Sequence, residues 1–314
     1  MEPKKLFKFL FFLLSILSGI SCSNDDSLIK PSTSSVSMEG EGGESVISFD
    51  NADWTIARVI NKDGNMNIYG NTYSKEGGLL TEATSLTLNG LGSMQSVWSD
   101  KGFTIVRDTP TSLKIILNEN MTDDDFNFVV LLQLGQEEKE ITVQQKKSEG
   151  YTFDKIEYAL NEGDGDSIYT GESNLSHTFN LSEPSELTMY PLINTYRESY
   201  FESIQDDAFL WTNNDSVLVK TPSDIYNGTI YYANVKSVYN DVFSREPVDY
   251  KQMPETVIIP AGKLKLETEI EYRRRKVSYL LTLINNRTKE TKTIHGKWIE
   301  ILPTGRFSTI LSNE

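Results

Sequence analysis

The chain has very little cysteine and histidine, with one Cys and two His among 314 residues. The single cysteine, Cys22, cannot form a disulfide within the chain and cannot build a Cys-ligated zinc site. A Ser-His-Asp triad would need His177 or His295, but neither lies near a G-x-S-x-G motif. We therefore expect a protein that is not an enzyme and that uses no metal and no cofactor.

Positive charge is also scarce, since 30 Lys and Arg face 45 Asp and Glu and the formal net charge is −15. This excess of negative charge argues against nucleic acid as a partner. The many carboxylates leave a glycosidase-type acid/base pair open, but nothing in the sequence singles out a pair. The one basic patch is Arg273 to Lys276, which we interpret as a solvated hairpin tip.

A long apolar run is missing as well, because the longest one, Leu6 to Ile20, is shorter than the roughly 20 residues that span a bilayer. Lys4, Lys5 and Lys8 form a basic segment at its beginning, no charge follows Lys8 within it, and small residues then lead to Cys22. This order is typical of a secretory signal, which we place at residues 1–21. A cleaved signal peptide followed by an incidental Cys22 is the alternative.

The segment Gly19-Ile20-Ser21-Cys22 resembles the lipobox of bacterial lipoproteins, although the usual leucine three residues before the cysteine is Gly19 here. The acidic stretch Ser23 to Asp26 resembles the tether of surface lipoproteins in Bacteroides-type bacteria. The resemblance implies that Cys22 is acylated, that residues 22–35 form a flexible tether, and that the outer membrane holds the protein facing the exterior. Loss of residues 1–21 removes three lysines and one glutamate and takes the net charge from −15 to −17.

Residues 36–147 contain short runs of alternating apolar and polar residues separated by turn residues, which indicates β-strands. The Gly42-Gly43 turn, the Asp53-Trp54 pair and the closing Ile141-Thr142-Val143-Gln144-Gln145 resemble a BACON domain. That resemblance implies an immunoglobulin-like β-sandwich that either binds carbohydrate or acts as a spacer. A polar link at residues 148–150 then predicts a domain boundary.

Residues 151–314 predict a larger antiparallel β domain, so the fold class we expect is all-β. Leu264 to Tyr272 alternates strictly, Arg273 to Lys276 interrupts it, and a C-terminal meander follows. The spacing of apolar residues predicts one short helix at Tyr200 to Leu210.

The sequence Val257 to Lys263, with His295 to Trp298 later in the chain, resembles the C-terminal part of aerolysin-like β-pore toxins of the epsilon-toxin group. The resemblance implies a segment that inserts into a membrane as a hairpin. Thr170 to Thr188 is the nearest candidate, but Pro184 interrupts it.

Two acidic stretches deserve comparison with cation sites. Asn161 to Asp166 has the alternating oxygen donors of a calcium loop, but it lacks the later glutamate of an EF-hand. Asp, Asn and Gly also form ordinary turns, so both interpretations stay open. Asp123 to Asp125 is better explained as a solvated turn.

Tyrosine is the strongest functional signal, since eight of the 15 tyrosines lie between Tyr190 and Tyr250. Flat aromatic rings with polar tips can stack on the C–H face of a sugar. We select four aromatics as candidate ligand-binding residues: Trp211, Tyr226, Tyr231 and Tyr232. Trp211 is expected to be exposed because it borders a polar turn.

The leading hypothesis is therefore non-catalytic recognition of a glycan or cell-surface ligand by residues 151–314. A β-pore-forming or pore-related protein is the first alternative, and a structural stalk or assembly subunit is the second. An exposed aromatic cluster would favour recognition, and a long unpacked hairpin would favour the pore.

Overall fold

The computed structural model describes residues 27–62, 66–212, 217–248 and 253–313. The regular structure in these ranges is β-strand throughout, apart from a 3₁₀ turn at Leu210–Thr212 (η1), so the predicted all-β fold class is confirmed. The described ranges contain no helix that is long and apolar enough to cross a membrane. The predicted signal peptide and Cys22 lie outside the described residues.

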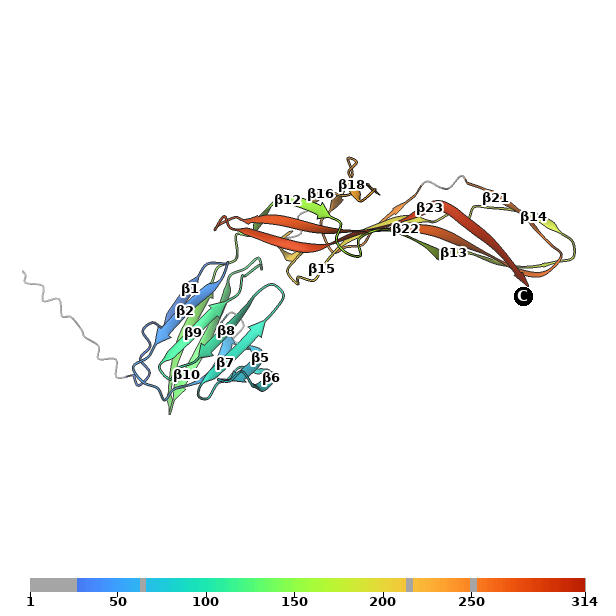
Figure 1. The fold of residues 1–314 in the computed structure, drawn as a ribbon. Helices are drawn as coiled ribbons and strands as arrows, with labels where there is room; N and C mark the ends of the chain where they lie inside the picture. Colours follow the sequence, from blue (N-terminus) through green and yellow to red (C-terminus); the bar gives the residue numbers. More distant parts are fainter. Residues whose placement is uncertain (1–26, 63–65, 213–216, 249–252, 314) are drawn as a thin grey trace, which may run out of the picture.

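The N-terminal strands form two facing sheets of a β-sandwich (Figure 1). The order β1-β11-β10-β3-β4 is built from Ser35–Met38 (β1), Glu137–Gln145 (β11), Phe126–Leu134 (β10), Thr55–Asn61 (β3) and Met66–Asn67 (β4). The order β2-β9-β8-β7-β5-β6 is built from Gly43–Ser48 (β2), Ser112–Leu117 (β9), Gly102–Arg107 (β8), Gly92–Val97 (β7), Tyr69–Ser74 (β5) and Leu79–Ser85 (β6). β1 runs parallel to β11, whereas the neighbouring pairs β10–β11 and β8–β9 are antiparallel.

Alternating side chains from both sheets fill the core of the sandwich. In β9 every second residue is buried, as expected for a strand with one face on a core. Phe103 and Phe128 stack across the two sheets with ring centroids 4.5 Å apart. Ile29 is also fully buried in this core, and Pro31 forms a β-bridge with Phe49. Part of the predicted tether therefore packs against the sandwich.

The C-terminal strands form a second assembly, organised around two long strands. The main sheet has the order β12-β22-β23-β15-β20, and β13 also pairs with β22. Its strands are Tyr151–Ala159 (β12), Gly262–Asn285 (β22), Thr291–Asn313 (β23), Tyr196–Ser203 (β15), Ser244–Pro247 (β20) and Gly165–Leu181 (β13). Three two-stranded sheets complete it: Ser185–Met189 (β14) with Glu255–Ile259 (β21), Leu218–Lys220 (β16) with Lys236–Val238 (β19), and Asp224–Tyr226 (β17) with Thr229–Tyr231 (β18).

β22 and β23 form one long antiparallel hairpin that runs the length of this assembly (Figure 1). At about 3.3 Å per residue, the 24 residues of β22 span about 80 Å. The predicted break at Arg273 to Lys276 is wrong, because the strand continues through all four residues. The turn that joins the two strands is held by Asn285, whose Oδ1 accepts from the backbone N–H groups of Arg287 and Thr288 at 3.0 and 2.8 Å.

Two hydrophobic cores lie along the hairpin. The larger core includes Trp298, Leu281 and Tyr239, and Trp211 belongs to it. The smaller core, toward the end of the hairpin where β22 begins, is formed by Met189, Ile259, Leu264 and Leu266.

The predicted helix at Tyr200 to Leu210 is wrong. Its first residues belong to β15, where Tyr200 pairs with Ile299 and Phe201 with Trp298 in β23. Phe201 is buried against Tyr239, so its ring lies in the core as expected, but a strand rather than a helix places it there. The residues after Ser203 form turns that lead into η1.

The proposed membrane-insertion segment Thr170 to Thr188 is part of the folded sheets. β13 pairs with β22 up to Leu181, and β14 pairs with β21 from Ser185. Pro184 lies between the two strands, in agreement with the prediction that it interrupts this segment.

Candidate functional site

The tyrosines chosen from the sequence meet on the short hairpin β17–β18. Asn227 and Gly228 form its turn with φ angles of 50° and 73°. Two successive positive φ angles are typical of the two-residue turns that match the twist of a hairpin, and Asn-Gly is the preferred pair. That dipeptide between apolar residues is the signal that would have located the hairpin from sequence.

The register of the hairpin decides which side chains are exposed. Ile225 pairs with Ile230, and both pack against the larger C-terminal core. Tyr226 and Tyr231 lie at the alternate positions and point to the other face, where they are 65% and 50% exposed. Tyr232, the next residue, is 43% exposed. Tyr226 and Tyr231 therefore share the outer face of one hairpin, which we call the tyrosine hairpin, and Tyr232 follows its second strand at the alternate position.

Tyr232 is partly fixed by its neighbours. The Nζ of Lys220 lies 5.4 Å from the centroid of its ring, within the range of a cation–π contact. The ring of Tyr158 is 6.2 Å away on the strand β12. Partial burial raises the pKa of Tyr232, so its hydroxyl stays protonated at neutral pH.

Trp211 is not part of this surface. The expectation that it is exposed is wrong, because only 5% of the residue is accessible. Its Nε1–H donates to the carbonyl of Ala208 at 2.9 Å, and its ring lies 5.8 Å from that of Tyr239. The 3₁₀ turn of η1 directs the indole into the core, whereas its polar neighbours in the sequence suggested an exposed position.

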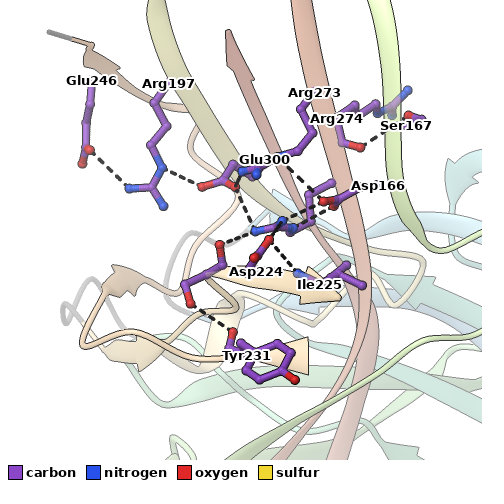
Figure 2. A network of polar contacts seen from close by, with 12 residues as sticks. Asp166, Ser167, Arg197, Asp224, Ile225, Tyr231, Glu246, Arg273, Arg274 and Glu300 are labelled. Carbon is purple, nitrogen blue, oxygen red and sulfur yellow. Dashed lines mark hydrogen bonds and ion pairs between the residues drawn. The ribbon is translucent and has the colours of Figure 1, made fainter. Parts of the chain in front are cut away.

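A buried arginine connects the hairpin to the main sheet (Figure 2). Arg275 of β22 has no exposed side-chain surface. Its Nε and Nη2 donate to the two carboxylate oxygens of Asp166 at 2.8 and 2.7 Å. Nη2 also donates to Asp224 Oδ1 at 2.8 Å, and Nη1 donates to the carbonyl of Ser223. The guanidinium thus holds the first residues of the tyrosine hairpin.

Glu300 forms the other side of this cluster. It is 3% exposed and faces Arg275 directly across the β22–β23 pair. Its carboxylate accepts from Arg197 Nε at 2.6 Å and from Arg273 Nη2 at 3.1 Å, and Arg275 Nη1 is 3.7 Å away. Figure 2 shows these carboxylates and guanidinium groups converging between the strands.

The interpretation of Arg273 to Lys276 as a solvated tip is therefore also wrong. Because side chains alternate along a strand, Arg273 and Arg275 share the face that carries the buried cluster, and Arg274 points to the opposite face. Burial alone would lower the pKa of Arg275, but the hydrogen bonds and charges of its carboxylate partners outweigh burial and raise it. The guanidinium is permanently charged.

The acidic loop that resembled a calcium site is occupied by the protein's own cations. Asp164 Oδ1 lies 2.6 Å from Lys297 Nζ, and its Oδ2 accepts from Ser278 Oγ at 2.6 Å. Asp166 is bound to Arg275, as described above. Within the described ranges, the His, Cys, Asp and Glu side chains form no group of three or more that could hold a metal.

The two histidines both lie in strands. His177 is in β13, where its ring is 6.4 Å from that of Phe179. His295 is in β23 opposite Leu280. The predicted absence of enzymatic activity stays a prediction.

Comparison with known proteins gives no family. No protein-family model matches the chain, and no curated protein matches it. The BACON and lipoprotein resemblances therefore stay predictions.

Among 16 matching chains of solved structures, three illustrate the resemblance to parts of the fold. The parasporin-2 toxin of Bacillus thuringiensis, described as recognising cancer cells, is 10% identical over 52% of this chain and 73% of its own, with a TM-score of 0.32. A Bacteroides thetaiotaomicron protein is 18% identical over 42% of this chain and 99% of its own, with a TM-score of 0.25. The lamprey immune protein is 10% identical over 88% of both chains, with a TM-score of 0.21. TM-scores this low carry no argument about function.

Proposed function

We propose that the chain is a surface protein that recognises a glycan on a cell or in a polysaccharide through the tyrosine hairpin, without catalysing a reaction. The observation that carries this proposal is the exposure of Tyr226 and Tyr231 on one face of the hairpin, with Tyr232 partly exposed next to them. A structural role would not require two large aromatic side chains in water on the same face. Aromatic side chains offer much contact area for little loss of rotamer freedom, which is why they dominate binding surfaces.

The chemistry of tyrosine matches a sugar. Its ring stacks on the apolar C–H face of a pyranose, and its hydroxyl can bond the hydroxyls at the rim. Among the described residues, no protein group bonds the hydroxyls of Tyr226 or Tyr231, so both remain available to a ligand. A purely apolar ligand would leave these hydroxyls without partners.

The hairpin is held in place before any ligand arrives. Arg275 binds Asp224 and Ser223 at its base, and Ile225 and Ile230 anchor its inner face in the core. A site ordered in advance loses less entropy on binding than a flexible loop does. The turn at Asn227 is therefore presented by a supported element.

In this proposal, the location of the protein in the cell follows from the N-terminal end of the chain. Acylation of Cys22 would tether the protein to the outer membrane, with the rest of the chain facing outward. The membrane would then be a partner through the lipid, and nucleic acid would not be a partner because the chain carries a net charge of −15.

The proposal is tested by binding of the full chain to an array of bacterial and host glycans. The double variant Tyr226→Ala/Tyr231→Ala should lose at least about thirtyfold in affinity, because truncating one stacked aromatic at a hot spot costs about 2 kcal/mol. Its thermal unfolding should stay unchanged, since both side chains are exposed.

Tyr69→Ala is the matched control, because Tyr69 is 62% exposed on β5 of the N-terminal sandwich. It should bind as the wild type does. If the wild type binds no glycan on the array, or if the double variant binds normally, the hairpin is not a glycan site and a stalk role gains support.

A further inference from the structure

The sheet face opposite the buried arginine cluster carries a second, separate cleft. Arg274 pairs with Ile301, Ile301 with Glu198, and Glu198 with Arg245, so one row of side chains crosses four strands. Paired residues share a face of the sheet, and Tyr272 lies on the same face two residues before Arg274. Ile301, Glu198 and Arg245 of this row line a cleft of about 210 Å³, and Arg274, next to Ile301 at the end of the row, lies outside the lining.

One wall of the cleft is formed by two stacked tyrosine rings, which we call the aromatic plate. Tyr169 of β13 and Tyr272 of β22 are direct partners in the sheet. Their rings are stacked, with centroids 5.6 Å apart and an angle of 19° between the planes. Tyr169 is 41% exposed, so part of the plate faces solvent.

The facing wall carries a guanidinium. Arg245 lies over the ring of Tyr196, with its Cζ 3.8 Å from the ring centroid. Its Nε is 3.4 Å from Glu198 Oε1, and its side chain is 57% exposed. Stacking on an aromatic ring fixes the plane of the guanidinium and leaves its outer N–H groups free to donate.

The charges of the cleft lining cancel, and Arg274 at its edge makes the local charge positive although the chain is strongly acidic. Glu198 is the one carboxylate among the described residues that line the cleft, and Arg245 already pairs with it. Arg274 adds a second exposed cation with no carboxylate within ion-pair distance among the described residues. Burial and the charge of Glu198 raise the pKa of Tyr169, and the charge of Arg274 offsets part of this rise.

We propose that this cleft binds a carboxylated sugar, such as a sialic or uronic acid unit, with its ring against Tyr169 and Tyr272 and its carboxylate toward Arg245 and Arg274. An inorganic anion would not need the aromatic plate, and a neutral sugar would not need two cations. The cleft is below the roughly 300 Å³ at which pockets for larger ligands begin, so it accommodates a single sugar ring. The site does not rest on the tyrosine hairpin, which lies toward the other face of the sheet.

The test uses the full chain with three oligosaccharides, and binding is followed by ligand-observed NMR and by calorimetry. Sialyllactose and a hyaluronan tetrasaccharide each supply a carboxylated ring, and lactose is the matched neutral sugar. We expect sialyllactose or the hyaluronan fragment to bind and lactose to bind at least about tenfold more weakly. Binding should weaken as salt is added.

Arg245→Gln and Arg274→Gln should each reduce binding of the acidic probe by about tenfold or more, because each removes a charge-assisted hydrogen bond. Both side chains are exposed, so the variants should fold normally. Arg306→Gln is the matched control, because Arg306 is 81% exposed on β23 and belongs to neither proposed site, and it should keep this binding unchanged. Equal binding of lactose, absence of binding by both acidic probes, or normal binding by both arginine variants would overturn the proposal.

Discussion

Arg275 and Asp224 are joined by a hydrogen bond of 2.8 Å that links the longest strand of the protein to the tyrosine hairpin. The guanidinium has no exposed surface, whereas the carboxylate of Asp224 is 60% exposed. One partner is therefore fixed in the interior of the assembly, and the other carries the hairpin at its surface. The position of the tyrosines depends on a buried charge that lies outside the hairpin itself.

Replacing this charge should destabilise the C-terminal assembly. In Arg275→Met, the carboxylates of Asp166 and Glu300 lose a cation in a buried environment, which costs about 3–5 kcal/mol. Urea unfolding should show a lower midpoint. Asp224→Asn is the control, because it removes one exposed partner and should cost about 1 kcal/mol or less. Equal midpoints for Arg275→Met and the wild type would contradict this account of the cluster.

Trp211 should behave as a core residue. Trp211→Ala removes a buried indole and leaves a cavity beside Tyr239, which should cost about 3–5 kcal/mol of unfolding free energy. Trp98, which is 41% exposed, is the matched control, and Trp98→Ala should cost clearly less. Calorimetry of both variants decides the question. A loss of glycan binding in Trp211→Ala with unchanged stability would restore it as a ligand-binding residue.

Asp164 should make stability depend on pH in the acid range. Burial alone would raise its pKa, but hydrogen bonds from Lys297, Ser278 and Asn161 lower it below the ordinary value of 3.8. The unfolded chain then binds a proton more readily than the folded chain does. The contribution of Asp164 is complete above about pH 4 and is lost as the pH falls through the lower folded pKa.

Unfolding free energies of the wild type and of Asp164→Asn, measured from neutral to acid pH, test whether the contribution of Asp164 is lost as the pH falls. The variant should be less stable at neutral pH, and the difference between the two proteins should shrink as the pH falls. A difference that stays constant across the range would show that the charge of Asp164 does not contribute.

The features that the sequence predicts well are those fixed by neighbouring residues. The strict alternation of Leu264 to Tyr272 places every second side chain on one face, and this stretch is a strand in β22. The turn at Asn285 follows from local hydrogen bonding of an amide side chain. The exposure of Tyr226 and Tyr231 likewise follows from alternation in a short hairpin.

The features that the sequence does not predict depend on distant partners. Arg275 is buried because carboxylates from distant parts of the chain pair with it. Asp166 lies 109 positions earlier in the chain, and Asp224 lies 51 positions earlier. From the sequence alone, four adjacent cations suggest a solvated patch, because the carboxylates that pair with them lie far away in the chain. Trp211 is buried because Tyr239 and Phe201 complete its core, while the residues that follow it in the sequence, Thr212 to Asp215, are polar. Local composition is a poor guide where tertiary contacts decide burial.

The N-terminal anchor gives a prediction that is independent of the fold. Cys22→Ala should leave the protein without lipid and should move it from the membrane fraction to the soluble fraction. The several acyl chains of a bacterial lipoprotein bind a bilayer far more firmly than one chain does. Incorporation of a labelled fatty acid into the wild type measures the modification directly. A wild type that takes up no label would remove the lipid anchor from the proposal.

The joint between the sandwich and the C-terminal assembly is held by polar contacts. The carboxylate of Glu119 accepts from Tyr151 Oη at 2.7 Å and from Ser148 Oγ at 2.7 Å. Glu41 of the sandwich binds Arg287 in the turn between β22 and β23. Each such partly exposed contact contributes about 1 kcal/mol or less to stability. Together these contacts therefore hold the two assemblies against each other only weakly.

The double variant Glu41→Gln/Glu119→Gln should therefore be cut faster than the wild type by a protease at residues 146–151, the boundary expected from the sequence. High salt should speed cleavage of the wild type by weakening the Glu41–Arg287 contact. Because few strong contacts would be lost, both fragments should keep the unfolding temperatures of the intact parts. Cleavage inside the strands, or unfolding of one fragment on release, would show that the two assemblies form a single cooperative unit.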